Sequence, residues 1–288
     1  MKQENQFTER YYTQYRDLNS PFTQILKTLL LEFIEQIDLI KNLIKRGLIS
    51  EYRRSFIGAL WILLSPLIQI ISWTVLKKAS ILNAGETDVP YPVYILTGTL
   101  IWGLFFNTFN ASISTLSKYR TLLLRSQIPV ELFFIVDTTL TTTPFLISFY
   151  LSSLIFIFFN IAISPIIFAL PILIIPIILF ANALGMFLSI FTIISYDFRR
   201  IVKALFSFAL FFTPIVYSYN SLEPTLFKTI VWLNPLTYLV TTPRDLILKT
   251  SPISINSYLF YSIVSLLVFY ISFRIFNFSK QRLLERIF

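Results

Sequence analysis

Cysteine and histidine are both absent from this chain of 288 residues. The first absence excludes disulfide bonds, and the two together exclude a Cys/His metal site. Without histidine there is also no imidazole for general acid–base or nucleophilic catalysis. Glycine is scarce, and Gly98 and Gly103 alone have the spacing of a phosphate-binding loop, but Leu104 and Phe105 follow where such a loop has Lys and Ser or Thr. We therefore expect no nucleotide-binding loop in this chain.

Charged residues are also few. They make up 14% of the chain, whereas hydrophobic residues make up 55%. A typical soluble domain carries about 25% charged residues, so this composition is typical of a membrane protein with several spans. Residues 1–20 are polar and lack the apolar core of a signal peptide, so we expect no cleaved leader.

Six stretches are long and apolar enough to cross a bilayer, which takes about 20 residues of helix. They are residues 56–76, 91–116, 132–163, 166–195, 204–222 and 253–273. The third and fourth exceed a single crossing, and the prolines in the fourth permit kinks. We predict an all-α integral membrane protein with a cytoplasmic N-terminal region (1–55), a six-span transmembrane domain (56–277) and a cytoplasmic tail (278–288).

The basic residues predict the orientation of these spans. An even number of spans puts both termini on one side of the membrane. If that side is the cytoplasm, the inner segments hold 19 Lys and Arg and the outer segments hold five. Cytoplasmic loops carry such an excess. The bias therefore predicts a multi-pass protein with both termini in the cytoplasm, and it explains the net charge of +9 without a nucleic-acid partner.

A striped segment precedes the first span. Between residues 22 and 49, apolar residues recur mostly every three or four positions, and charged residues such as Glu35, Lys41, Lys45 and Arg46 occupy other faces. This spacing predicts one amphipathic helix or two in series. A coiled-coil or core-packing position fits the pattern too, but the short distance to the first span favours the membrane interface.

Asp137 is the only acidic residue well inside an apolar stretch, about two helical turns from its inner end. Two roles stay open for it: an ion pair with a basic group on a neighbouring helix, or a part in transport. The threonines after it can satisfy carbonyls freed by Pro144, or they can line a polar path. The candidate path-lining residues are Asp137, Thr138, Thr141, Thr142, Trp61 and Trp102.

Two inner loops are basic. The loop between the second and third spans, residues 117–128, reads as a short helix that carries Leu122, Leu123 and Leu124 and ends at Pro129. A connecting loop needs no such apolar content, so exposed leucines there predict docking onto a soluble partner. The other loop, at residues 196–200, reads YDFRR. With the striped segment, these loops would form a cytoplasmic platform.

The segment at residues 221–251 contains two apolar stretches that are too short to span a membrane, LFKTIVWL and LTYLVTT. Asn234 and Pro235 separate them, and Trp232 and Tyr238 suit a membrane interface. Two short helices that dip into the outer leaflet and a pair of surface helices both fit this pattern.

Four stretches, in this order, resemble one known family: EYRRSFIGALWILLSPL, DVPYPVYILTGTLIWGLFF, SYDFRRIVKALFSFALFFTPIVY and WLNPLTYLVTTPRDLIL. From about residue 30 to its C-terminus, the chain is similar to the membrane subunit of type-two ABC exporters. These transporters move polysaccharides (O-antigen, capsule or teichoic acid) across the bacterial inner membrane.

The resemblance implies a permease that is not itself an enzyme. It implies a homodimer bound to two copies of a separate ATPase, which would use ATP and magnesium, while this chain holds no cofactor or metal. The implied substrate is a lipid-linked glycan that passes between the two permeases. The implied location is the bacterial cytoplasmic membrane, in contact with its lipids.

The resemblance also implies roles for three segments. Residues 22–49 would be a gate helix, and the charged residues of that region are Glu35, Lys41, Lys45, Arg46, Arg53 and Arg54. Residues 117–128 would be a coupling helix that inserts into the ATPase. The expected contact residues are Lys118, Tyr119, Arg120, Leu122, Leu123, Leu124, Arg125, Arg199 and Arg200. Residues 223–249 would be re-entrant helices. Many relatives carry an aromatic-Pro-Arg element in the coupling region, where this chain has SQIPVEL.

A secondary transporter and a membrane-embedded glycosyl or acyl transferase are the alternatives. The first class often shows inverted repeats and midplane charges, whereas this sequence shows no repeat and one off-centre acid. The second class needs a loop rich in acids or histidine, and the largest outer segment has only Glu223 and Asp245. The sequence therefore favours the ABC exporter.

Overall fold

The computed structural model describes residues 22–53, 56–125, 128–162, 164–192 and 195–287. Every regular element within these ranges is helical, which confirms the all-α prediction. In chain order, with η for a 3-10 turn, the elements are α2 (Phe22–Glu35), α3 (Ile37–Arg53), η1 (Gly58–Leu60), α4 (Trp61–Lys78), α5 (Tyr91–Lys118), α6 (Arg120–Arg125), α7 (Val130–Ser152), α8 (Ile155–Phe158), η2 (Pro165–Ala169), α9 (Leu170–Leu173), α10 (Ile175–Thr192), α11 (Tyr196–Phe208), η3 (Tyr219–Ser221), α12 (Leu226–Leu233), α13 (Pro235–Leu248) and α14 (Ile255–Ile287).

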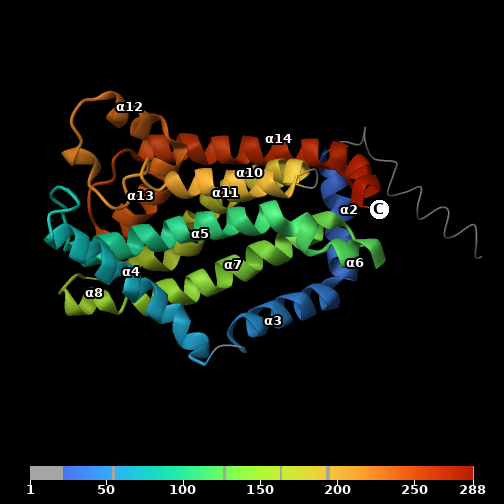
Figure 1. The fold of residues 1–288 in the computed structure, drawn as a ribbon, viewed down its shortest axis with the longest axis horizontal. Helices are drawn as coiled ribbons and strands as arrows, with labels where there is room; N and C mark the ends of the chain where they lie inside the picture. The colour runs from blue at the N-terminus through green and yellow to red at the C-terminus, as the bar shows by residue number, and fades with distance from the viewer. Residues whose placement is uncertain (1–21, 54–55, 126–127, 163, 193–194, 288) are drawn as a thin grey trace, which may run out of the picture.

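The long helices lie side by side along the long axis of the molecule (Figure 1). At one end, α2 crosses the bundle near α6 and near the C-terminal end of α14, while α8, α12 and α13 lie at the other end. α5 is the central helix, because it packs against α4, α7, α10 and α13. Its buried Phe109 lies against Phe206 of α11, with 4.3 Å between the ring centroids.

Five helices in the described ranges are long and apolar enough to cross a membrane. They are Gly58–Lys78, Tyr91–Lys118, Val130–Phe158, Pro165–Thr192 and Ile255–Ser279. These helices coincide with five of the six expected spans, with ends that differ by a few residues. The last helix continues to Ile287, so most of the expected C-terminal tail is an extension of α14.

The remaining expected span, 204–222, is wrong as a continuous helix. α11 ends at Phe208, and turns follow as far as Tyr217. Pro214 has no N–H to continue a helix. The chain still follows α5, because Arg199 donates a hydrogen bond to Ser117 at one end of α5 and Tyr91 at the other end donates to the Val216 carbonyl.

Side chains from other helices satisfy the carbonyls that these turns leave without backbone partners. Tyr91 of α5 donates to the Val216 carbonyl at 2.9 Å, and Asn234 donates to the Phe212 carbonyl at 2.9 Å. Inside a membrane such partners are needed, because there is no water to replace them. The irregular backbone is therefore supported by α5 and by the segment that begins α13.

The striped N-terminal segment was expected to form one amphipathic helix or two in series. It forms two, α2 and α3. Ile40 of α3 is buried in a cluster that also contains residues of α7 and α14, while Glu35, Lys41, Lys45 and Arg46 are exposed. The two expected short helices before the last span are α12 and α13. Most residues of α13 are buried against α14, α5 and η2.

Candidate functional site

A groove of about 610 Å³ lies between α3, α4, α5 and α7. Each long helix contributes a stripe of residues that are three or four positions apart and therefore share one face. From α4 the stripe is Trp61, Ser65 and Gln69; from α5 it is Thr99, Gly103, Asn107 and Ala111; from α7 it is Asp137, Thr141, Pro144 and Ser148. The groove therefore follows the helices along much of the bundle.

Three polar side chains of the groove have no hydrogen-bond partner among the described residues: Ser65, Gln69 and Asn107. All three are exposed. Other polar side chains of the groove are paired, since Thr141 and Thr108 share a hydrogen bond of 2.9 Å and Ser148 donates to the Ile62 carbonyl. Two carboxamides and a hydroxyl thus remain available to a molecule in the groove.

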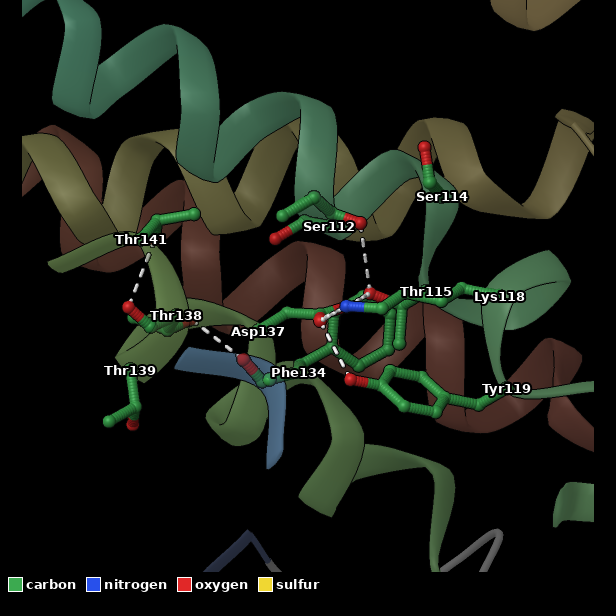
Figure 2. A network of polar contacts seen from close by, with 12 residues as sticks. Ser112, Ser114, Thr115, Lys118, Tyr119, Phe134, Asp137, Thr138, Thr139 and Thr141 are labelled. Carbon is green, nitrogen blue, oxygen red and sulfur yellow. Dashed lines mark hydrogen bonds and ion pairs between the residues drawn. The ribbon is translucent and has the colours of Figure 1, made fainter. Parts of the chain in front are cut away.

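The end of the groove beside the α5–α6 junction holds a buried carboxylate. Figure 2 shows Asp137 of α7 between Thr115, Lys118 and Tyr119 at the end of α5. Thr115 donates a hydrogen bond to its Oδ2 at 2.7 Å, Tyr119 donates to Oδ1 at 2.9 Å, and the Lys118 ammonium forms an ion pair with Oδ1. Of the two roles left open for Asp137, the structure shows the ion pair. A fully buried carboxylate requires such partners.

This arrangement fixes the junction between α5 and α6. Tyr119 lies between the two helices, and its ring stacks on Phe133 of α7 at a centroid distance of 4.5 Å. Burial, and then the neighbouring Asp137 carboxylate, raise the pKa of the Tyr119 phenol. The phenol therefore stays protonated and remains a hydrogen-bond donor. A displacement of α6 would act on α7 through these contacts.

A second set of polar contacts lies deeper between α5, α7 and α10. The Asn182 side chain of α10 accepts hydrogen bonds from Ser112 at 2.6 Å and from Thr138 at 3.0 Å. Thr138 therefore points toward α10 and not into the groove. Trp102 is buried against Phe105.

Of the six candidate path-lining residues, the groove contains Trp61, Asp137 and Thr141. Thr138 and Trp102 lie in the packed interior instead. The Thr142 hydroxyl is buried, has no partner among the described atoms and lies outside the groove lining.

The expectation of exposed leucines in the 117–128 loop is wrong for Leu123. This side chain is 8% exposed and belongs to the buried cluster that contains Ile40, Phe133 and Phe276. Leu122 packs partly against the same cluster. The side chains of Leu124 and Arg125 lie outside the described part of the chain. The apolar side of α6 is used within this chain, since Leu123 packs in a cluster with residues of α3, α7 and α14.

The basic residues expected at the inner end are largely on the surface. Arg120 and Arg200 are exposed, and Lys118 is half-exposed. Arg199 reaches Ser117 of α5 at 2.7 Å, so the start of α11 lies beside the end of α5. The Arg53 side chain and all of Arg54 lie outside the described part. The structure thus brings the two basic loops together.

A buried ion pair at the other end of the bundle was not expected from the sequence. Arg244 of α13 donates to Asp245 at 2.7 Å and to the Pro214 carbonyl at 3.0 Å, and its guanidinium stacks on Tyr94. Burial raises the pKa of the Asp245 carboxyl, and the Arg244 charge opposes that shift. An Arg-Asp pair inside an apolar helix is the signal that could have indicated this site.

The sequence of the chain matches the family model described as ABC-2 type transporter over residues 38–248. One relative is the O-antigen export system permease protein RfbA of Myxococcus xanthus, which is 29% identical over 104 residues. That alignment covers 35% of this chain and 37% of the relative, so the chain spans little more than a third of that protein. The family match, in contrast, extends from α3 to the end of α13 and includes four of the five membrane-spanning helices. This chain is a multi-pass membrane protein that belongs to the ABC-2 type transporter family.

Proposed function

We propose that this chain is the permease subunit of an ATP-driven exporter that moves a lipid-linked polysaccharide across the cytoplasmic membrane of a bacterium. The observation that carries the proposal is the groove between α4, α5 and α7, whose unpaired polar side chains lie on membrane-spanning helices of an ABC-2 transporter. The similarity to a permease named for O-antigen export supports a polysaccharide of the O-antigen, capsule or teichoic-acid type.

The groove forms part of the substrate path in this proposal. Unpaired carboxamides are costly next to lipid, since nothing there replaces their hydrogen bonds. Gln69 and Asn107 are therefore explained by water or by a polar molecule in the groove. Its α5 side extends from Thr99 to Lys118, which is about 28 Å of helix and nearly the thickness of the hydrocarbon core.

In this proposal, two copies of a separate ATPase bind ATP and magnesium and supply the energy for transport. Two copies of this chain form the membrane part of the transporter. The ATPase contacts the inner end of the bundle, where Arg120 and Arg200 are exposed. Movement of α6 reaches the groove through Tyr119 and Asp137, which join α6 to α7. This chain has no catalytic role of its own in the proposed cycle.

The end of the bundle that contains α2 and α6 faces the cytoplasm in this proposal, in agreement with the excess of basic residues there. α11 and the turns after it make the sixth crossing, since they follow α5 from Ser117 to Tyr91. An even number of crossings then places both termini in the cytoplasm. α12 and α13 form a re-entrant pair at the outer side.

A transport measurement with inverted membrane vesicles tests the proposal. The vesicles contain this chain, the ATPase that co-purifies with it and lipid-linked glycan, and the assay measures glycan that becomes protected inside the lumen. We expect protection that requires ATP and that persists when a protonophore removes the proton gradient. Protection that requires the gradient and not ATP would replace the proposal with a secondary transporter.

A further inference from the structure

The unpaired polar groups of the groove come from two facing helices. Gln69 lies on α4 and Asn107 on α5, and Ser65 lies one turn before Gln69. A carboxamide has two N–H donors and a carbonyl acceptor, and a hydroxyl both donates and accepts. Side chains of this kind match the hydroxyl groups of a sugar, which also donate and accept. They offer no full charge to an anionic group.

The charges in the described lining of the groove cancel each other. Lys118 and Asp137 are the two charged residues there, and they form an ion pair with each other at the inner end. A polyanionic chain would carry a negative charge at regular intervals along the groove. Each such charge loses its hydration on entry and needs a cation beside it, and beyond Lys118 the described lining supplies carboxamides, hydroxyls and apolar groups.

An aromatic face completes the lining, at the level of Ser148 of α7, which donates a hydrogen bond to the Ile62 carbonyl. Trp61 lies one turn before Ser65 and is 40% exposed. Its flat apolar surface suits the C–H face of a sugar ring, while its neighbours on α4 supply polar groups further along the groove. A neutral sugar ring presents both of these surfaces, hydroxyls at its edge and C–H groups on its face.

From this lining we infer that the groove selects an uncharged, hydroxyl-rich stretch of glycan over a polyanionic one, and that Gln69 and Asn107 make the selection. The inference rests on the proposed function, because it names the class of substrate that the groove accepts. It narrows that proposal from polysaccharides in general to those whose exported repeat is neutral.

A fluorescence titration tests the inference with the full-length chain in complex with its co-purifying ATPase. The probes are maltoheptaose, which is neutral, and a galacturonate heptamer, which has the same length and one carboxylate per ring. The signal is the tryptophan emission that disappears in the Trp61→Phe variant. We expect maltoheptaose to change this emission at a concentration about tenfold or more below that of the galacturonate.

Variants test whether Gln69 and Asn107 select the neutral sugar. Gln69→Leu combined with Asn107→Leu should weaken maltoheptaose binding about tenfold or more, since two hydrogen-bonding groups are lost. Asn256→Leu on α14 removes an exposed carboxamide outside the groove lining, and it should leave the binding unchanged. Gln69→Lys should shift the preference toward the galacturonate.

Galacturonate binding as tight as that of maltoheptaose would overturn the inference, and so would an emission that responds to neither sugar. An equal loss of binding in the Asn256→Leu control would overturn the role of the two groove residues. These results leave the proposed function intact as long as the vesicles still export glycan with ATP. Loss of ATP-dependent export from vesicles is the separate result that refutes the proposed function.

Discussion

Replacing Lys118 with methionine should destabilise the protein more than replacing Asp137 with asparagine, although Lys118 is the more exposed residue of the pair. Asp137 is fully buried, and in Lys118→Met its carboxylate keeps the hydrogen bonds from Thr115 and Tyr119 but loses its counter-charge. Removal of one partner from a buried pair costs about 3–5 kcal/mol. Because the Lys118 side chain is 46% exposed, we expect a lower cost of about 2–3 kcal/mol.

The asparagine variant leaves no buried charge. Its amide still accepts from Tyr119, and the loss is limited to the charge-assisted part of these hydrogen bonds, about 1 kcal/mol. In the double variant, Lys118→Met with Asp137→Asn, the methionine does not leave a buried carboxylate without a counter-charge, because residue 137 is uncharged. The double variant should therefore cost less than the sum of the two single variants, by about 1–2 kcal/mol.

Unfolding of the full-length chain by SDS from detergent micelles, followed by circular dichroism, gives the three free energies. Lys118→Ala serves as a second removal of the ammonium, with a shorter side chain, and should behave like Lys118→Met. The reasoning is refuted if Lys118→Met costs no more than Asp137→Asn, or if the double variant equals the sum of the two. Either result would mean that the carboxylate does not depend on this ion pair.

Three further predictions concern packing and topology. A Cβ at Gly185 would lie 2.4 Å from the Ser112 Cβ and 3.1 Å from the Phe109 carbonyl oxygen, whereas one at Gly103 would meet nothing within 4 Å. Gly185→Ala should therefore lower the thermal midpoint, at a cost of about 1–3 kcal/mol, and Gly103→Ala should not lower it. Leu123→Ser should destabilise the isolated chain by about 2 kcal/mol or more, and an unchanged melting temperature would show that Leu123 is not packed within the chain. In intact cells, an impermeant thiol reagent should label Glu86→Cys but not Ser117→Cys, and the reverse pattern would invert the topology.

The membrane spans could be predicted because bilayer thickness sets the length of an apolar helix. The segment at 204–222 was the exception, since its apolar composition satisfies the same criterion while Pro214 and the side chains of Tyr91 and Asn234 favour turns. Hydropathy does not distinguish a helix from an irregular segment whose carbonyls are satisfied by other helices. That distinction depends on tertiary contacts that no local window contains.

The candidate site was predictable in its residues but not in their arrangement. The position of Asp137 inside an apolar run indicated a partner, but only the packing of α5 on α7 selects Lys118. Leu123 was expected to be exposed because a short loop offers little to bury it, whereas residues of α3, α7 and α14 form a cluster that covers it. The sequence did not indicate that Gln69 and Asn107 line a groove, because a single carboxamide in an apolar run does not show which helix face it shares with other polar residues.

Chemical closure of the groove tests the central claim most directly. The chain has no cysteine, so Gly103→Cys gives a bulky maleimide a single target, at a position whose side chain would meet no heavy atom within 4 Å. The same vesicles are assayed before and after labelling, with labelled wild-type vesicles as the control. We predict that labelling abolishes ATP-dependent glycan export while the ATPase stays bound. Export at the unlabelled rate from fully labelled vesicles would contradict the assignment of this groove as the substrate path.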